Sequence, residues 1–327
     1  MTILKRIRSW EGLLFALLSV IVTFNVTSTV DFVSVGNLEN LLQLHIEQAI
    51  VALVMTLLIV NGEIDLSVAS VMGMAACVMA QLVDSGIPIG WAVTAALLVS
   101  LLAGIFNGFC VAYVGLPSFL VTLATLISFR GVSRILLEDR AVGGFPDWFS
   151  AIGQTAVWGP FTASILIFFL LFVMVAVVLQ RSAFGRLIYM IGSNVQAARF
   201  SGVRVQRVKL MLFAITSLVA GLAGLLYAAR LGSVRGDTAT GFELDIITMV
   251  LLGGVSIAGG SGSIFGVGLS ILVILNLRDA MGLADVVGVT QTSVIGALLI
   301  LSALLPNVLG RLKERWRSTE VMKKQRI

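Results

Sequence analysis

Four acidic residues stand beside long apolar stretches, in two copies of the pattern Glu-x-Asp. Glu63 and Asp65 separate two apolar runs, and Glu243 and Asp245 lie at the start of a third. Carboxylates among apolar helices are costly and are usually functional or paired. One interpretation makes them a polar gate or contacts for a polar solute. The other places them at helix N-termini, where acids favour the positive end of the dipole and Ser67 helps to satisfy free amides. For Asp65 and Asp245 we favour the helix terminus, and the two roles can coexist.

Two asparagines lie inside apolar runs. Asn107 lies between Gly104 and Gly108, a GxxxG pair that favours close helix approach, and Asn276 occurs in a later run. Each amide can hydrogen-bond across a helix pair or line a polar path, and helix packing is the favoured role. Pro117 suits the first turn of a helix. That helix supplies further candidates to line a path, with lipid-facing or packing roles equally open: Phe119, Thr122 and Thr125.

Metal and nucleotide chemistry find little support in the sequence. His45 is the only histidine, and one histidine cannot build a zinc site. Cys77 and Cys110 lie in apolar runs and are interpreted as small packing residues. The glycine-rich stretch 253–262 lacks the lysine of a phosphate-binding loop, and no lysine occurs in 210–312. We therefore expect no cofactor in this chain, and a tight turn between closely packed helices at the glycine-rich stretch.

The composition sets the environment in which these residues lie. Of 327 residues, 58% are hydrophobic and 12% are charged, and the mean hydropathy is +1.04. A soluble domain is about 45–50% apolar and about 25% charged. The chain is therefore not a soluble enzyme, a disordered chain or a disulfide scaffold. About 190 apolar residues suffice for about nine or ten membrane-spanning helices of about 20 residues each. We expect an all-α polytopic membrane protein in which 1–327 form a single transmembrane domain. The predicted spans are 12–32, 46–60, 66–84, 89–114, 117–136, 162–180, 210–231, 245–257, 264–282 and 291–308.

Basic residues indicate the orientation, because cytoplasmic loops retain Lys and Arg. Sixteen of the 22 basic residues lie in the N-terminal tail, in the loop 181–209 and in the tail 310–327. Both tails are then expected to be cytoplasmic, which requires an even number of crossings, and ten spans satisfy this. The same count puts the loop 181–209 inside and the loop 137–161 outside. The outer loop carries acids and has Trp148 and Trp158 where interfacial aromatic residues are expected.

Two of these spans are short, and each adjoins a Glu-x-Asp motif. The span 46–60 stops just before Glu63, and the span 245–257 begins at the second motif. In each copy a glycine follows ten residues after the glutamate, and the copies are 180 residues apart with five predicted spans between them. An odd number of spans gives the two copies opposite orientation, as in an inverted repeat. Short, glycine-interrupted spans at matching positions point to a transport pathway, although two acids and a glycine also recur by chance.

The loop 181–209 is the only long internal segment predicted on the inside. Its run 194–200 has helical character and ends at Ser201 and Gly202. A short helix with small residues and one aromatic residue suits docking in a groove of a partner protein. A basic loop that faces anionic lipid is the alternative. We call 194–203 the docking segment, and its candidate contact residues are Asn194, Gln196, Ala197, Ala198, Arg199, Phe200 and Gly202.

Several long motifs in a fixed order carry a family resemblance. They are GEIDLSVAS (62–70), PSFLVTL (117–123) with Arg130-Gly131, GRLIY (185–189), AARFSGV (197–203), ARLG (229–232), TGFELD (240–245) and LGGVSIAGGSG (252–262). With these motifs the chain resembles, over about 36–308, the permease subunits of bacterial ABC importers for sugars, the ribose, xylose, galactoside and rhamnose group.

The resemblance implies a location in the bacterial inner membrane and a set of partners. These are a cytoplasmic ATP-binding subunit, a periplasmic or extracellular solute-binding protein, a second permease subunit in a homo- or heterodimer, and membrane lipid; we expect no nucleic acid. The chain itself is then a transport subunit and not an enzyme. The docking segment is the part that would meet the ATPase. The related motif often has Glu before Ala-Ala, where this chain has Gln196, so an ion pair there is not implied.

The resemblance leaves several solutes open. It implies import of a sugar, either a pentose or a deoxyhexose such as rhamnose, and LRDAMGLA (277–284) with TQT (290–292) looks closest to rhamnose-type permeases. Autoinducer-2 permeases share the same scaffold and also fit. An ion-coupled secondary transporter is a further alternative, in which the acids of the two Glu-x-Asp motifs would serve. A membrane enzyme is disfavoured, because the sequence offers no paired nucleophile and base and no metal-ligand cluster at helical spacing.

Overall fold

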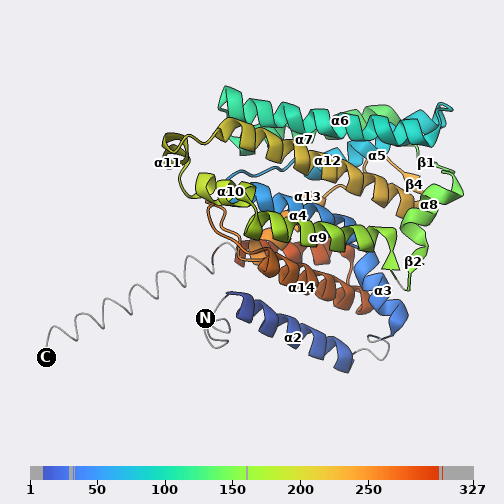
Figure 1. Ribbon diagram of the computed structural model, residues 1–327. Coiled ribbons are helices and arrows are strands. Elements are labelled where there is room, and N and C mark those ends of the chain that lie inside the picture. Colours follow the sequence, from blue (N-terminus) through green and yellow to red (C-terminus); the bar gives the residue numbers. More distant parts are fainter. Residues whose placement is uncertain (1–9, 29–31, 33, 160, 302–303, 305–327) are drawn as a thin grey trace, which may run out of the picture.

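The computed structural model describes residues 10–28, 32, 34–159, 161–301 and 304 (Figure 1). Helices account for most of these residues, so the prediction of an all-α polytopic fold is confirmed. In chain order the helices are α2 (Trp10–Ser28), α3 (Val35–Gln43), α4 (Ile46–Val60), α5 (Val68–Asp84), α6 (Ile89–Phe109), the π-helix η1 (Cys110–Val114), α7 (Ser118–Leu137), α8 (Asp147–Gln154), α9 (Ala163–Arg181), α10 (Ala183–Ser193), α11 (Val195–Phe200), α12 (Val205–Leu231), α13 (Phe242–Leu252), α14 (Ile264–Leu283) and a final helix Gly288–Leu301. Two short antiparallel ladders join β1 (Val142–Gly143) to β4 (Ser233–Val234) and β2 (Ala156–Trp158) to β3 (Phe161–Thr162).

Within the described part of the chain, six helices are long and apolar enough to cross a membrane. They are α2, α6 together with η1, α7, α9, α12 and α14. Four shorter apolar helices account for the other predicted spans. They are α4, α5, α13 and Gly288–Leu301. Each predicted span therefore overlaps one of these helices, although the helix α13 ends at Leu252, five residues before the end of its predicted span. The end of the tenth predicted span and both basic tails lie outside the described residues.

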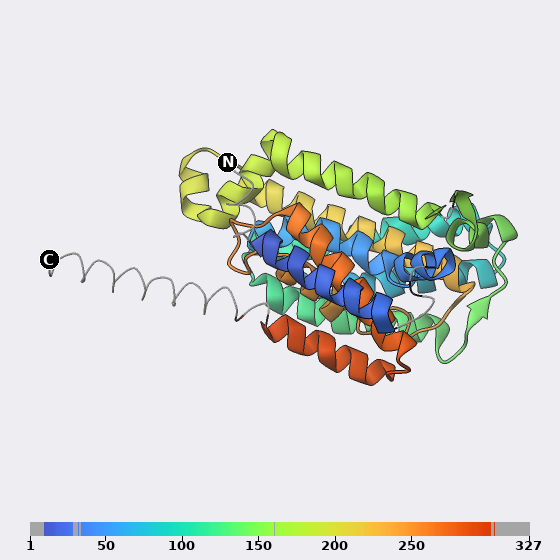
Figure 2. The ribbon, with the colours of Figure 1, turned by 90° about the horizontal axis from the view of Figure 1, so that it is seen from below.

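The long helices run side by side in one bundle (Figure 1). In that view α6 and α7 cover one side and α2 lies on the opposite side, with α4 and α13 between them. The helix α12 packs against α4, α5 and α6, and α14 packs against α2. Figure 2 shows α9 along one edge of the bundle and the final helix along the other. We call the end that carries α10 and α11 the α11 end, and the end that carries α3, α8 and the strands the β1 end (Figure 1).

The helix α4 forms the centre of the bundle. All of its residues are buried, and it packs against α9, α12 and α13. Its single acid, Glu47, accepts hydrogen bonds from Arg230 of α12, at 2.8 Å to Oε1 and 3.1 Å to Oε2. A helix that is surrounded by protein on every side needs no polar face, which explains its nearly unbroken apolar sequence. Its 15 residues span about 22 Å, less than the roughly 30 Å of a bilayer's hydrocarbon core.

Small residues let α6 and α12 approach closely. A Cβ atom on Gly104 would lie 2.6 Å from the carbonyl oxygen of Phe213, and one on Gly108 would lie 3.0 Å from Cα of Leu210. Real Cβ atoms do not approach other atoms to 2.6 Å, so a larger residue at Gly104 would force the two helices apart. The close helix approach predicted from the GxxxG pair is confirmed.

Besides α11, three described helices lie between the predicted spans. They are α3, which Ser34 caps; α8, which begins after Pro146 in the loop 137–161; and α10, which Ser182 caps in the loop 181–209. Each has apolar residues concentrated on one face, whereas the spanning helices are apolar on most sides. A search for long apolar runs therefore misses them.

Candidate functional site

Glu63 and Asp65 lie at the α11 end, between α4 and α5. Glu63 pairs with Lys209 of α12, and both side chains are largely buried. Asp65 is fully buried, and its Oδ1 accepts hydrogen bonds from the Ser67 amide at 2.8 Å and the Ser67 hydroxyl at 2.6 Å. Asn107 of α6 donates to the same hydroxyl at 2.9 Å. Asp65 therefore holds the turn just before α5, whose N-cap residue Ser67 makes no side-chain cap hydrogen bond to the helix, so the expectation that Ser67 satisfies free amides is wrong.

Glu243 and Asp245 lie in the first turn of α13, where the helix dipole favours acids. Glu243 pairs with Arg130 of α7 at 3.4 Å, and Arg130 also donates to two backbone carbonyls just before α13, at 2.8 and 3.0 Å. Asp245 is buried, and both of its carboxylate oxygens lie 2.7 Å from Nη2 of Arg278 on α14. Arginine side chains from two different helices therefore hold the first turn of α13 in place.

The four acids do not form a single cluster. Asp245 binds Arg278, which lies in one pocket with His45, the residue just before α4, whereas Glu63 follows α4. The length of α4, about 22 Å, separates the two neighbourhoods. The two motifs also differ locally, because Glu63 precedes its helix and Glu243 lies inside the first turn of its own. The motif match does not mark structurally equivalent positions, and contact of these acids with a solute stays a prediction.

Sequence reasoning selected the acids but missed their basic partners. The partners of Glu63, Glu243 and Asp245 are Lys209, Arg130 and Arg278. A usable signal exists for the two arginines, because an ionisable residue inside an apolar span calls for a partner. Lys209 was assigned to a loop, whereas α12 begins at Val205 and includes it.

The remaining predicted path residues mostly serve packing. The Thr122 hydroxyl is buried and donates to a carbonyl of its own helix at 2.8 Å, whereas Phe119 is exposed on the outside of α7. The backbone carbonyl of Asn276 accepts a hydrogen bond from Asn25 of α2 at 3.1 Å, whereas its side-chain amide donates to the Leu272 carbonyl of its own helix at 2.8 Å. Of the two asparagines, Asn107 therefore uses its side chain for a contact beyond its own helix, which is the role favoured from sequence, and the Asn276 side chain does not.

Glycines bring three backbone segments together at the α11 end. We call Gly62, Gly192, Gly259 and Gly260 the glycine junction. The Gly260 amide donates to the Val60 carbonyl at 2.8 Å, which joins the glycine-rich loop to the end of α4. A Cβ atom on Gly192, near the end of α10, would collide with that same carbonyl and lie 2.5 Å from the Gly260 nitrogen. The φ angle of Gly260 is +73°, a conformation that glycine adopts readily. The turn predicted between packed helices therefore also contacts α10.

The docking segment forms α11, a short helix that projects from the bundle (Figure 1). The Asn194 side chain caps it by accepting a hydrogen bond from the Ala197 amide at 2.9 Å, and Gly202 follows its end with φ of +80°. Phe200 is 91% exposed. The other exposed candidates in the segment are Asn194, Gln196, Ala197, Arg199 and Gly202.

The predicted role of Ala198 in contacting a partner is wrong. It was expected on the surface that approaches a partner, but it is fully buried within the protein's own core. The helix α11 packs against α10 and α12, and Ala198 faces that contact. Which face of a six-residue helix turns inward depends on tertiary packing, and the sequence of the segment alone does not reveal it.

Comparison with known proteins identifies the family. Residues 37–303 match the family described as branched-chain amino acid transport system / permease component. The chain is 33% identical to the ribose import permease protein RbsC of Haemophilus influenzae over 86% of this chain and 88% of the relative. It is 32% identical to RbsC of Escherichia coli K12, over 89% and 92%. It is also 32% identical to the autoinducer 2 import system permease protein LsrD of Photorhabdus laumondii, over 85% and 81%. No solved structure matches the chain.

The family match begins within α3 and ends with the final helix, so it takes in the buried charge pairs, the glycine junction and α11 alike. The relatives are transport subunits and not enzymes. Apolar helices of spanning length agree with a multi-pass protein of the inner membrane. The chain therefore belongs to this permease family, and its resemblance to the permease subunits of bacterial sugar ABC importers is confirmed.

Proposed function

We propose that this chain is the subunit through which an ABC importer moves a small sugar into the cytoplasm, powered by a separate ATPase. A second permease subunit, identical or different, completes the pathway, and a solute-binding protein delivers the sugar at the β1 end. Both termini and the α11 end then face the cytoplasm. The ribose import permeases among the relatives favour a pentose as the substrate.

The observation that carries this proposal is the exposed face of α11. Phe200 presents its ring at the tip of the molecule, and aromatic residues often anchor protein interfaces. Contacts with the rest of the protein fix the position of α11, because Ala198 is buried and the Asn194 side chain caps the start of the helix. A rigid helix with one apolar anchor suits a groove on another protein better than it suits a lipid surface. The sequence carries no phosphate-binding loop, so an ATPase subunit is the partner that the proposal requires.

Replacing Phe200 tests this contact. Phe200→Ala should lower co-purification of the ATPase and sugar uptake about tenfold, the scale of one interface hot spot. The thermal stability of the subunit should not change, because the ring contacts solvent and not the core. Phe24→Ala is the matched control, since Phe24 is also exposed but lies on α2. Ala197→Trp adds a second test, with bulk on the exposed side of α11. Wild-type uptake in both α11 variants would show that the ATPase binds elsewhere.

The orientation can be tested separately. Single cysteines introduced as Asp147→Cys and Arg199→Cys should react with a membrane-impermeant maleimide from opposite sides of the membrane. Asp147 begins α8 at the β1 end, and Arg199 lies on α11. Labelling of both positions from one side would refute ten spans with cytoplasmic termini.

A second candidate substrate follows from the autoinducer-2 permeases among the relatives. The complex reconstituted in proteoliposomes with its binding protein should take up labelled D-ribose when ATP is present. Unlabelled D-ribose, L-rhamnose and autoinducer-2 then compete in parallel, and the strongest competitor identifies the solute class. Uptake that needs an ion gradient and no ATP would replace the proposal with a secondary transporter.

A further inference from the structure

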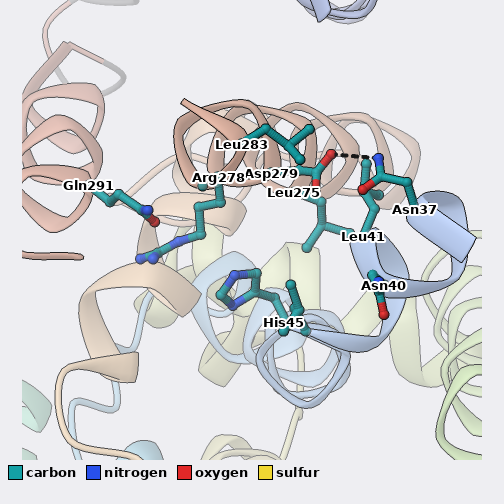
Figure 3. A pocket seen from close by; sticks show the side chains of 11 residues that line it. Asn37, Asn40, Leu41, His45, Leu275, Arg278, Asp279, Leu283 and Gln291 are labelled. Atoms are coloured by element: carbon teal, nitrogen blue, oxygen red, sulfur yellow. Dashed lines mark hydrogen bonds between the residues drawn. The ribbon is translucent and has the colours of Figure 1, made fainter. Parts of the chain in front are cut away.

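A polar pocket of about 450 Å³ opens near the β1 end, far from Glu63 and Asp65 but next to Asp245, which binds the lining residue Arg278 (Figure 3). It lies between α3, the start of α4, the last turns of α14 and the final helix. Figure 3 shows Gln291 and Arg278 extending toward each other from two helices, with His45 beside them and Asn37 and Asp279 across the space. The size falls within the range of small-molecule sites, about 300–1,000 Å³.

The polar groups of this pocket keep unused hydrogen-bonding capacity. Asn37 donates to Oδ2 of Asp279 at 3.0 Å, and Gln291 donates to a backbone carbonyl at 2.9 Å. Within the described residues, Oδ1 of Asp279, Oε1 of Gln291 and the whole side-chain amide of Asn40 take part in no hydrogen bond. A buried nitrogen of His45, Nδ1, also has no partner there. These groups offer both donors and acceptors to a ligand.

The charges in the pocket select against an anion. The guanidinium of Arg278 is neutralised, because Nη2 lies 2.7 Å from both oxygens of Asp245. The carboxylate of Asp279 has an amide for its partner and no cation within salt-bridge distance in the described structure. The net charge of the group is therefore negative. The Asp279 carboxylate disfavours a phosphate or an anionic lipid headgroup, whereas hydroxyl groups can donate to Asp279 and accept from the amides and from Nε of Arg278, which has no partner among the described residues.

We infer that this pocket binds a neutral polyhydroxylated ligand of monosaccharide size, held by Asn37, Asn40, Asp279 and Gln291. Leucine side chains at Leu41 and Leu275 line the same space and can cover the C–H face of a sugar ring. This inference rests on the proposed function, since it gives the imported sugar a contact on its way into the membrane. The four polar residues lie outside every site predicted from the sequence.

Asn40 is a suitable position for a test, because its side-chain amide makes no hydrogen bond to the described part of the protein and its replacement therefore breaks none. In the reconstituted complex with binding protein, Asn40→Leu and Gln291→Leu should each lower D-ribose uptake several-fold, and about tenfold together, because each removes a hydrogen bond to the sugar. ATP hydrolysis stimulated by the binding protein should stay within twofold of wild type, roughly the scatter of such assays. Thr290→Val is the matched control, since Thr290 neighbours Gln291 without lining the pocket. A merely structural role would lower ATP hydrolysis together with uptake.

A binding measurement separates this inference from the proposed function. Gly282→Cys, which lines the pocket outside the four binding residues and has free space for a side chain, is labelled with a membrane-impermeant maleimide in the assembled complex, without ATP. D-ribose should slow the labelling at least twofold, roughly the smallest change that such rates resolve, and inorganic phosphate should not. Protection by phosphate alone would overturn the charge argument, and no protection by either would overturn the pocket. If the wild-type complex imports no sugar yet ribose protects Gly282→Cys, the proposed function fails and the site survives. If wild type imports ribose and the pocket variants match it, the site fails and the function survives.

Discussion

Gly192 should be the position where a single methyl group does most harm at the α11 end. In Gly192→Ala the new Cβ would collide with the Val60 carbonyl and lie 2.5 Å from the Gly260 nitrogen. These two atoms form the 2.8 Å hydrogen bond that closes the glycine junction. Overpacking costs about 1–3 kcal/mol and a lost hydrogen bond about 0.5–1.5 kcal/mol, so we expect a loss of about 2–4 kcal/mol in stability.

The protein's own cysteines provide the assay. In a Cys110→Ser background, Cys77 is the only cysteine and is fully buried, so a thiol-reactive fluorophore reports its exposure on heating. Gly192→Ala should lower the apparent Tm by several degrees. Gly131→Ala is the control, because a Cβ at Gly131 meets no atom within 4 Å and alanine favours the helix by up to about 1 kcal/mol. Equal melting of Gly192→Ala and the background protein would show that the junction tolerates a side chain and is not closely packed.

The same melting assay checks three further changes. Lys209→Met should lower the free energy of unfolding by about 1–3 kcal/mol, because it leaves the largely buried Glu63 carboxylate without its cation. Adding Glu63→Gln should recover part of this loss, and no recovery would mean that the two side chains are not coupled. Asp65→Ala should cost about 1–2 kcal/mol through the two lost hydrogen bonds to Ser67, and an unchanged Tm would refute its role in holding the turn before α5. Gly104→Val should keep α6 from packing closely against α12 and so lower the yield of folded protein. A monodisperse peak in size-exclusion chromatography at wild-type yield would contradict that packing.

The parts of this fold that follow from apolar length were predictable from the sequence. The ten predicted spans, including the two short ones, and the helical run at 194–200 all correspond to described helices. Hydropathy and capping residues, on which these predictions rest, are local properties of the sequence. The partners of the acids were not predictable in the same way. Glu63 and Lys209 are 146 residues apart, and only the packing of α12 beside the α4–α5 connection brings them together. The buried side of α11 at Ala198 was missed for the same reason.

The polar pocket was also beyond sequence reasoning. Its residues come from α3, the two residues before α4, α14 and the final helix; those of α14 and the final helix largely fall in the stretches 277–284 and 290–292 that resemble rhamnose-type permeases, but those of α3 fall in no motif. Asn40 and Gln291 are ordinary polar residues near helix ends when they are viewed one at a time. What distinguishes them is that each turns toward a common space, which depends on how α3 packs against α14. The family resemblance supplies fold and partners, and its rhamnose-type stretches form one side of the pocket, but it does not indicate that α3 forms the other side.

The complete burial of α4 also constrains how the chain enters the membrane during synthesis. Insertion proceeds segment by segment, yet α4 is only 15 residues long and carries Glu47 in its first turn, so it is a weak insertion signal when it is alone. The cation that neutralises Glu47 is Arg230, which is synthesised 183 residues later. Until α12 has been synthesised, α4 lies beside lipid or in the translocon, and the Glu47 carboxylate has no arginine partner. Newly made chains that end before Arg230 should therefore be held by chaperones or degraded, and the interval between these two residues sets the period in which the nascent permease is most vulnerable.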